Sequence, residues 1–400
     1  MPQFGSFALL FALALSAYSL VIGGLSLFRL SSSGASTADL RASRLLETAR
    51  RAGIATWIAV SCAAFALVWA AFTNDFSLEY IREHSNRALA IPYKFAVLWS
   101  GQEGSLLFWL LLLSTYGFVL RVRHKVDRRL YAYAGVVVAA VQLFFLLLVN
   151  FAATPFAMAT QRVSEGNGLN PLLQYPEMVI HPPMLYLGYV GFTVPFAFAL
   201  GALMMRYPGE RWIAITRRWT MVAWLFLTCG IFLGAHWAYS VLGWGGYWGW
   251  DPVENASLMP WLAGTAFLHS VMMQEKRGMM KSWNMWLIFT TFLLAIMGTF
   301  LTRSGLVSSV HAFAQSSIGG WFLWFMGITF AVCLFTYLKN RDHLESENQL
   351  QSLASREASF LFNNIVLLAS CFTILWGTLF PKISEYVQGH TVTVGPPFYN

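Results

Sequence analysis

The residues with the clearest chemical potential form one stretch, which runs from Trp244 to Asn255 and reads WGGYWGWDPVEN. Its large rings belong to Trp244, Tyr247, Trp248 and Trp250. Single tryptophans and tyrosines are ordinary at a membrane interface, but four within seven positions exceed that pattern. The intervening glycines permit close backbone approach and unusual dihedral angles. We therefore expect a surface that can lie against a large planar apolar ligand such as a porphyrin.

Several charged residues have both a structural and a ligand-binding interpretation. Asp251, Pro252 and Glu254 match the N-cap, N1 and N3 positions of a helix start. That capping role would not exclude a ligand role for Asp251. Arg303 could pair with a haem propionate, since arginine binds carboxylates bidentately, or it could anchor a helix end at the membrane surface.

Two histidines, His181 and His311, could supply axial ligands to haem iron, and a third, His269, is a candidate functional residue inside a span. His181 precedes Pro182 and Pro183, which predicts extended geometry just before a helix start and a rigid rim position. His269 lies about 12 Å along a helix from Trp261, well inside the hydrocarbon, where an ionisable group is a functional hypothesis by default. A neutral His269 bonded to another helix is the alternative. His311 follows the eighth apolar run.

The remaining histidines receive no ligand role. His236 lies near the outer end of the sixth apolar run, and we expect it to be a bystander. The loop histidines are expected to be solvated, on the general exposure of such residues: His84, His124, His343 and His390.

The elements that must position these residues are membrane-spanning helices. Hydrophobic residues make up 57% of the 400-residue chain and charged residues only 11%, too few to cover a water-soluble surface. We expect an all-α polytopic membrane protein with about ten spans and no separate soluble domain, so that residues 1–400 form one membrane domain. The candidate spans are 5–28, 52–74, 104–120, 130–154, 184–205, 219–242, 256–273, 282–302, 318–338 and 359–380.

The distribution of basic residues predicts the orientation. Of the 26 Lys and Arg, 20 lie in alternate loops, which are 29–51, 121–129, 206–218, 274–281 and 339–358. Because such loops face the cytoplasm, the N-terminus and residues 243–261 are predicted to lie outside. His181 and His311 fall on the same outer side by span parity. The basic residues are divided among five loops, so nucleic-acid binding is not expected.

Several segments resemble a known family. WGGYWGWDPVENASLMPWL is similar to the WWD signature of haem-handling membrane proteins. Four further segments resemble the CcmF and NrfE branch of haem lyases. They are KFAVLWSGQEGSLL (94–107), IHPPMLYLGYVG (180–191), LTRSGLVSS (301–309) with His311, and GPPFYN (395–400).

The resemblance implies a haem lyase subunit of cytochrome c maturation in a bacterial inner membrane, with its active face in the periplasm. Such a protein positions haem for thioether attachment to the CxxCH motif of apocytochrome c. The resemblance makes His181 and His311 ligands of the outer haem and His269 a ligand of a second, b-type haem in the membrane. It also implies partners: the haem chaperone CcmE and apocytochrome c delivered through CcmH and CcmI, with quinol as a further candidate.

Alternatives to this function remain at the level of sequence. The chain could be a haem exporter or permease of the same family, a nitrite-reductase-specific lyase like NrfE, or an assembly scaffold without chemistry. The four cysteines lie in apolar runs without CxxC spacing, so we expect the substrate to supply both thiols. Family members are longer than this chain, and we expect that the C-terminal part of the family pattern, with the second membrane histidine, is missing.

Overall fold

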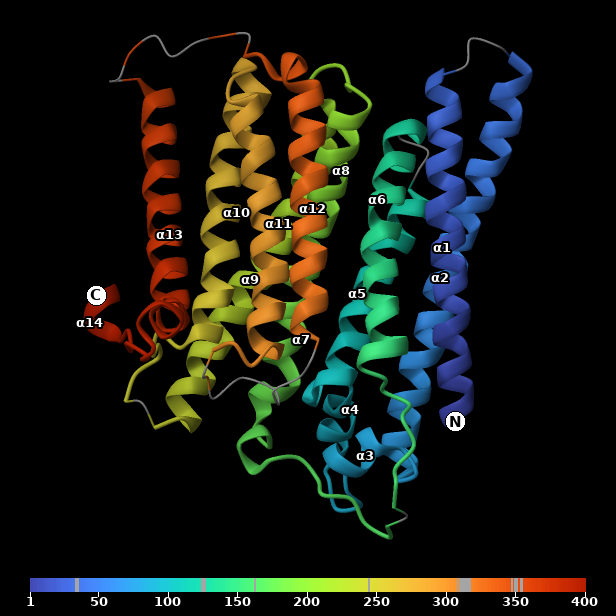
Figure 1. Cartoon of the computed structure of the whole chain (residues 1–400), viewed down its shortest axis with the longest axis vertical. Coiled ribbons are helices and arrows are strands. Elements are labelled where there is room, and N and C mark those ends of the chain that lie inside the picture. The colour runs from blue at the N-terminus through green and yellow to red at the C-terminus, as the bar shows by residue number, and fades with distance from the viewer. Residues whose placement is uncertain are drawn as a thin grey trace. The chain divides into compact units, whose positions relative to one another are not determined.

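The protein is built from helices, in agreement with the predicted all-α polytopic membrane fold (Figure 1). A computed structural model describes all residues except 33–35, 124–126, 162, 244, 308, 310–317, 347, 349–351 and 353–354. Among the described residues, β-type pairing is limited to one isolated bridge, between Leu78 and Met158. The contacts divide the chain into two compact units, Met1–Pro182 and Pro183–Asn400, and the expectation of one membrane domain stays a prediction.

The first unit is a bundle of long helices with short ones at one end. Within it α1 packs against α2 and α6, and α2 also packs against α5. Its elements are α1 (Pro2–Ser32), α2 (Ser36–Thr73), α3 (Glu79–His84), α4 (Ile91–Ser100), α5 (Gln102–Val122), α6 (Arg128–Leu147), the π-helical η1 (Leu148–Ala152) and the 3-10 helix η2 (Pro171–Leu173). The helix α7 (Pro176–Gly191) begins in this unit and continues into the next.

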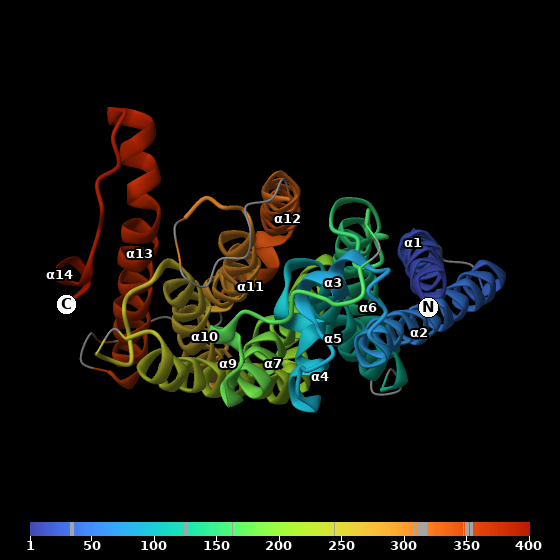
Figure 2. The same cartoon turned by 90° about the horizontal axis from the view of Figure 1, so that it is seen from below.

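The second unit is arranged around α10, which packs against α9, α11 and α13 (Figure 2). Phe196 of α8 stacks on Phe292 of α11 with ring centroids 4.0 Å apart, which joins a further helix to this core. The elements are α8 (Thr193–Met204), α9 (Arg211–Val241), α10 (Pro252–Arg277), α11 (Lys281–Arg303), α12 (Gly319–Asn340), η3 (Arg341–Leu344), α13 (Arg356–Gln388) and α14 (Pro396–Tyr399).

Reciprocal glycine contacts bring α7 and α9 close together. A Cβ atom at Gly188 would lie 2.6 Å from the backbone nitrogen of Leu227, and one at Gly230 would lie 2.8 Å from that of Leu185. Only glycine leaves room for the two backbones to approach so closely, which is the way helices commonly associate in membranes.

Nine helices among the described residues are long and apolar enough to cross a membrane, against about ten predicted spans. The predicted span 256–273 lies in α10, which has 26 residues and a length of about 39 Å but is not among the nine. Its polar residues Asn255, Ser270 and Gln274 are buried against neighbouring helices. A helix enclosed by protein can carry such groups, so its average polarity understates its ability to span.

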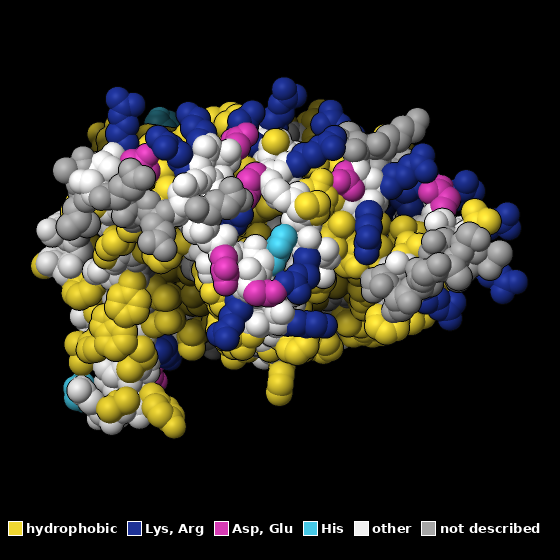
Figure 3. Space-filling view, turned by 90° about the horizontal axis from the view of Figure 1, so that it is seen from above, with side chains coloured by type: hydrophobic (Ala, Val, Ile, Leu, Met, Phe, Trp, Pro, Cys, Tyr) yellow, Lys and Arg dark blue, Asp and Glu magenta, His cyan; other side chains and the backbone are white. Residues whose placement is uncertain are grey.

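Each unit has one end with most of its basic residues. In the first unit this end holds the ends of α1 and α5 and the starts of α2 and α6 (Figure 1). In the second unit it holds the connections that follow α8, α10 and α12. Figure 3 looks onto these ends and shows many Lys and Arg side chains there. The tryptophan-rich loop and α14 lie at the opposite end of the second unit. Which end faces the periplasm stays a prediction of the charge distribution.

The first testable prediction concerns this orientation. The two ends of α9 (Arg211–Val241) should lie on opposite sides of the membrane, since 31 helical residues extend about 46 Å. In a cysteine-free background, Gly246→Cys should react with a membrane-impermeant thiol reagent in intact spheroplasts, and Pro208→Cys should react only after lysis. Gly246 has open space around its Cβ position and Pro208 is exposed, so both thiols are accessible. Labelling of Pro208→Cys alone in intact spheroplasts would reverse the orientation.

Candidate functional site

The tryptophan-rich loop joins α9 to α10 through a backbone that uses left-handed conformations. Gly243 and Gly245 have φ values of 66° and 71°, which favour glycine. Trp250 also has a positive φ, 54°, which is uncommon for a residue with a side chain and carries a conformational cost. That conformation needs support from surrounding contacts. Trp244 lies outside the described residues.

The described rings of the loop are each held by another ring. Tyr247 is 56% exposed and stacks on Tyr239 of α9, with centroids 4.5 Å apart and planes 15° from parallel. Trp248 meets Trp250 edge to face at 5.9 Å. Trp250 stacks on Tyr399 of α14 at 4.7 Å and 11°. One face of Trp250 is therefore occupied by the chain itself, a contact that the predicted ligand-binding surface did not include.

The predicted helix cap at Asp251 is confirmed. Asp251 Oδ2 accepts a hydrogen bond from Val253 N (3.0 Å) and Glu254 Oε2 accepts one from Asp251 N (3.1 Å), which completes a capping box with Pro252 in the first turn. Glu254 Oε2 also accepts from Gly249 N (2.9 Å), so the cap reaches back into the loop. In addition Ser309 Oγ donates to Asp251 Oδ2 (2.6 Å). The cap thus ties the loop to the segment that follows α11.

A buried amide joins the C-terminal segment to the same helix start. Asn255 is fully buried, and its Nδ2 lies within hydrogen-bonding distance of Trp250 O (3.2 Å), Thr378 Oγ1 (3.0 Å) and Tyr399 OH (3.4 Å). Trp250 Nε1 donates to Asn400 Oδ1 (3.0 Å). Burial raises the pKa of the Tyr399 phenol further above physiological pH.

The sequence interpretation missed this role of Asn255 and of the GPPFYN segment. Both were noticed within motifs, but no periodicity or spacing in the sequence indicates that residues 255 and 399 meet. The backbone carbonyl of Trp250, which sits in a strained conformation, is one of the groups that Asn255 satisfies. The amide therefore supports the conformation of the loop as well as the position of α14.

Arg303 is buried at the end of α11, with 2% of its surface exposed. Its Nη1 donates to Thr299 O (3.3 Å) and to Thr302 Oγ1 (2.9 Å), and its Nη2 donates to Tyr186 OH (2.9 Å). The interpretation as an interfacial anchor stays a prediction. The propionate interpretation stays a prediction, and the structure adds a role in joining α7 to α11.

His269 lies half-buried on α10 beside α13. Its Nδ1 is 2.8 Å from Nδ2 of Asn363, and its ring centroid is 6.3 Å from that of Phe360. The bond to another helix that the sequence offered as the alternative is therefore present. This bond does not conflict with iron ligation, because metal-binding histidines commonly hydrogen-bond through their second ring nitrogen. The amide of Asn363 can turn over and accept from Nδ1–H, so Nε2 is the nitrogen that would bind iron.

His181 lies in the first unit, inside α7 rather than in an extended residue before a helix. The helix starts at Pro176, so the predicted span start at 184 and the predicted geometry of His181 are wrong. A proline at position 182 frees the carbonyl of Met178 four residues earlier. Trp99 Nε1 donates to that carbonyl (2.9 Å), which satisfies it and allows the helix to continue.

The segment 94–107 that contains Trp99 is held in place by buried polar contacts of its own. Lys94 is buried, and its Nζ donates to Asn74 Oδ1 (2.6 Å) and to Ala71 O (3.3 Å) at the end of α2. Burial lowers the pKa of this ammonium group, and the hydrogen bonds compensate part of the lost hydration. Gly101 N donates to Tyr80 OH (3.0 Å). These contacts fix the tryptophan that supports the helix of His181.

The other histidines show different environments. His311 lies outside the described residues, and His236 is exposed on α9. Two loop histidines expected to be solvated are half-buried instead: His84 stacks on Tyr80 at 4.4 Å, and His343 Nε2 lies 2.8 Å from Tyr207 O. Within the described part of the chain, no three His, Cys, Asp or Glu side chains gather as a metal-ion cluster. A haem needs no such cluster, because its porphyrin supplies four ligands.

The fold and these motifs define a polytopic helical membrane protein with an aromatic loop braced at one end of its second unit. The chain belongs to the cytochrome c assembly protein family, whose model matches residues 99–308, more than half of the sequence. That range includes Trp99, the tryptophan-rich loop and Arg303.

Known proteins of this kind resemble the chain along most of its length. It is 43% identical to the cytochrome c-type biogenesis protein CcmF of Pseudomonas aeruginosa over 352 residues, 86% of this chain and 53% of that protein. It is 36% identical to NrfE of Haemophilus influenzae over 405 residues, 100% of this chain and 62% of that protein. A solved structure of the cytochrome c haem lyase CcmF matches with a TM-score of 0.79 at 30% identity, covering 100% of this chain and 58% of the other. The predicted resemblance to CcmF is confirmed, and the chain spans little more than half the length of these relatives.

The second prediction tests the amide that braces the loop. Asn255→Leu should lower the stability of the purified protein by about 1–3 kcal/mol, because Trp250 O, Thr378 and Tyr399 lose a shared buried donor. Thermal unfolding followed by tryptophan fluorescence measures the change.

Asn364→Leu is the matched control. Asn364 is also fully buried, but neither polar atom of its side chain has a hydrogen-bond partner among the described residues. Its replacement should therefore leave the unfolding temperature unchanged or raise it. Equal destabilisation by both substitutions would contradict the bracing role of Asn255.

Proposed function

We propose that the chain is the haem-positioning part of a cytochrome c haem lyase system. In this proposal it holds haem at the periplasmic face of a bacterial inner membrane while the thiols of a CxxCH motif in apocytochrome c add to the haem vinyl groups. The observation that carries the proposal is the braced aromatic loop in a chain of the cytochrome c assembly family. Apolar rings that other rings and the helix cap already hold in place suit a porphyrin, because they need no reordering when the ligand arrives.

The proposed reaction requires the protein to position its substrates rather than to supply a nucleophile. In each attachment a thiol S–H adds across one vinyl double bond, so a C–S and a C–H bond form and no oxidant is consumed. The four cysteines of the chain lie in helices assigned to the membrane, so the substrate is proposed to supply both thiols. Holding haem and peptide in register removes much of the entropic barrier to such a reaction.

Specific residues are proposed for the substrate haem. His181 and His311 would ligate its iron, and the histidine of the substrate motif would replace one of them as product forms. Trp244, Tyr247, Trp248 and Trp250 would contact the ring. Asp251 would hold the loop in register, and Arg303 would pair with a propionate. The support for these roles is the motif resemblance together with the loop contacts described above.

His269 fits a second haem as an axial ligand. Its depth on α10 and the orienting amide of Asn363 are what a membrane haem ligand needs, since the amide fixes the rotation of the imidazole. A b-type haem at this place would supply electrons that keep the substrate iron ferrous. Quinol is the proposed source of those electrons, and CcmE, CcmH and CcmI are the proposed partners for haem and apocytochrome delivery. An NrfE-like role with a nitrite reductase is the alternative within the same chemistry.

The third prediction tests the outer ligands. His181→Ala or His311→Ala, introduced at the chromosomal locus so that natural partners are present, should abolish cytochrome c maturation. Each substitution removes one of the two proposed protein ligands of the substrate iron. Haem staining of membrane and soluble cytochromes in denaturing gels measures covalent attachment.

His236→Ala is the matched control, because this histidine is exposed on α9 and has no proposed ligand role. It should mature cytochromes as the unaltered chain does. Normal maturation in both His181→Ala and His311→Ala would refute the ligand assignment. If haem supplied outside the cell restores cytochrome c maturation in either variant, the result would favour a haem exporter instead.

The fourth prediction tests the membrane haem. Asn363→Leu should weaken haem binding at His269 by about 10–100-fold, the usual effect of removing a group that orients a metal-binding histidine. Optical titration of the purified chain with haem measures the affinity, and His269→Ala defines the signal of this site. Asn364→Leu changes the neighbouring residue and should leave the affinity intact. If Asn363→Leu binds haem as tightly as the unaltered chain, Asn363 does not orient the ligand.

A further inference from the structure

A cavity of about 620 Å³ lies in the first unit, at its basic end. Its walls come from α1, α2, α5 and α6. Part of the wall is apolar and includes Leu30, Leu46, Ala132 and Val136. Four arginines and one glutamate also line it: Arg50, Arg121, Arg128, Arg129 and Glu47. The haem sites proposed above use none of these residues.

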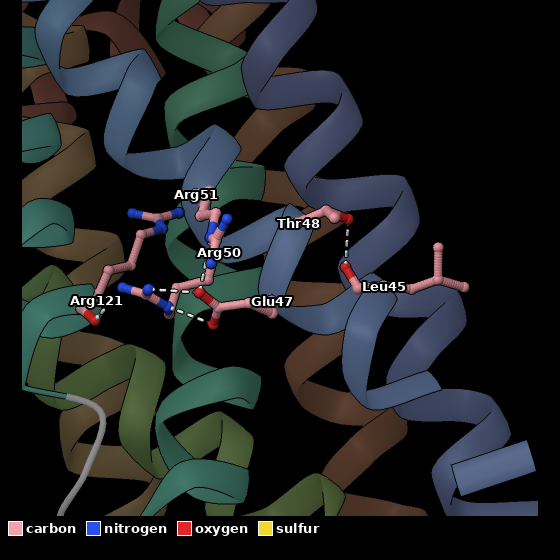
Figure 4. A network of polar contacts seen from close by, with 6 residues as sticks. All are labelled: Leu45, Glu47, Thr48, Arg50, Arg51 and Arg121. Carbon is pink, nitrogen blue, oxygen red and sulfur yellow. Dashed lines mark hydrogen bonds and ion pairs between the residues drawn. The ribbon is translucent and has the colours of Figure 1, made fainter. Parts of the chain in front are cut away.

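The glutamate is already neutralised by its neighbours on α2 (Figure 4). Arg50 Nη2 and Nε donate to the two carboxylate oxygens of Glu47 at 2.7 and 2.8 Å, and Arg51 Nε donates to one of them at 3.0 Å. Figure 4 shows the guanidinium of Arg50 turned toward Glu47 and that of Arg121 turned away from it. The carboxylate therefore does not compensate the remaining arginines of the cavity.

Arg121 carries a buried charge that the described chain does not pair. It is 5% exposed; its Nη2 donates to Gly135 O (3.3 Å), and its Nη1 has no hydrogen-bond partner among the described residues. Glycines at 53 and 117 make room for it, since a Cβ atom at either position would overlap the guanidinium. A buried cation that lacks an anion is costly, so a bound anion would relieve that cost.

Arg128 and Arg129 extend the positive charge to the cavity's exposed edge. Both are exposed at the start of α6, and no carboxylate of the described residues forms an ion pair with either. Asp127 beside them is engaged as the N-cap of α6, where it accepts from Leu130 N (3.0 Å). Arginine side chains are well suited to phosphate, which they can bind with two parallel hydrogen bonds.

We propose that this cavity binds an anionic membrane phospholipid, with the phosphate group on Arg121, Arg128 and Arg129 and the acyl chains against the apolar wall. The position favours a lipid because α1 ends and α6 begins beside the cavity, at the level where the helices leave the hydrocarbon. The volume lies in the usual range of ligand sites, about 300–1,000 Å³. Basic pockets between membrane helices on the cytoplasmic side are a general solution for anionic headgroups.

The test uses the purified full chain, stripped of lipid and offered defined phosphatidylglycerol or phosphatidylcholine with identical acyl chains. Native mass spectrometry counts the lipids that remain bound. The unaltered chain should retain phosphatidylglycerol preferentially, and Arg128→Gln with Arg129→Gln should weaken retention roughly tenfold or more. Arg121→Gln should do the same if its thermal unfolding shows that it folds.

Arg41→Gln with Arg44→Gln is the matched control. It also removes two positive charges, from exposed positions on α2 at the same end of the unit, but neither residue lines the cavity. Unchanged retention in this control supports a specific site. Equal loss in both double variants, or equal retention of phosphatidylcholine, overturns the proposal. Displacement of the lipid by inorganic phosphate at equal concentration would assign the site to a soluble anion and would also overturn it.

Discussion

Hydrogen bonding at the first turn of α10 is the interaction on which the rest of the second unit depends. Asp251 and Glu254 cap this turn, and Asn255 follows them into the buried interior. The same groups bind the backbone of the tryptophan-rich loop, the segment at Ser309 and the C-terminal α14. Polar groups that the protein buries must find hydrogen-bond partners within it. Segments about 60 and 150 positions from the loop meet there for that reason.

Prolines interrupt the hydrogen bonding of three helices, and each freed carbonyl belongs to a turn that contacts another helix. The carbonyl that Pro182 frees is bonded by Trp99. In α10 Pro260 frees Ala256 O, which faces Gly298 of α11, where a Cβ atom would lie 3.2 Å away. In α13 Pro381 frees Gly377 O, and α14 packs its tyrosine and phenylalanine rings against the Cα of this glycine.

The sequence predicted what is local and missed what is distant. The cap at Asp251 follows from three neighbouring residues, and the spans follow from apolar runs, so both could be read directly. The start of α7 could not, because it depends on an indole nearly 80 positions away that satisfies Met178. The polarity of α10 also required its neighbours to be known, since burial between helices decides whether Asn255 and Gln274 are tolerated. His84 and His343 were misjudged for the same reason, because loop composition does not reveal tertiary contacts.

The two units carry different chemistry, with aromatic rings and a strained loop at one end of the second unit and an arginine-lined cavity at the basic end of the first. The central claim is that the aromatic end holds haem before it becomes covalently attached. A pyridine haemochrome spectrum of the chain purified from its natural host tests this most directly. The account predicts haem of the b-type signature, with both vinyl groups intact and fully extractable by acidified acetone. A preparation that is folded, retains its native partners and contains no haem would contradict it.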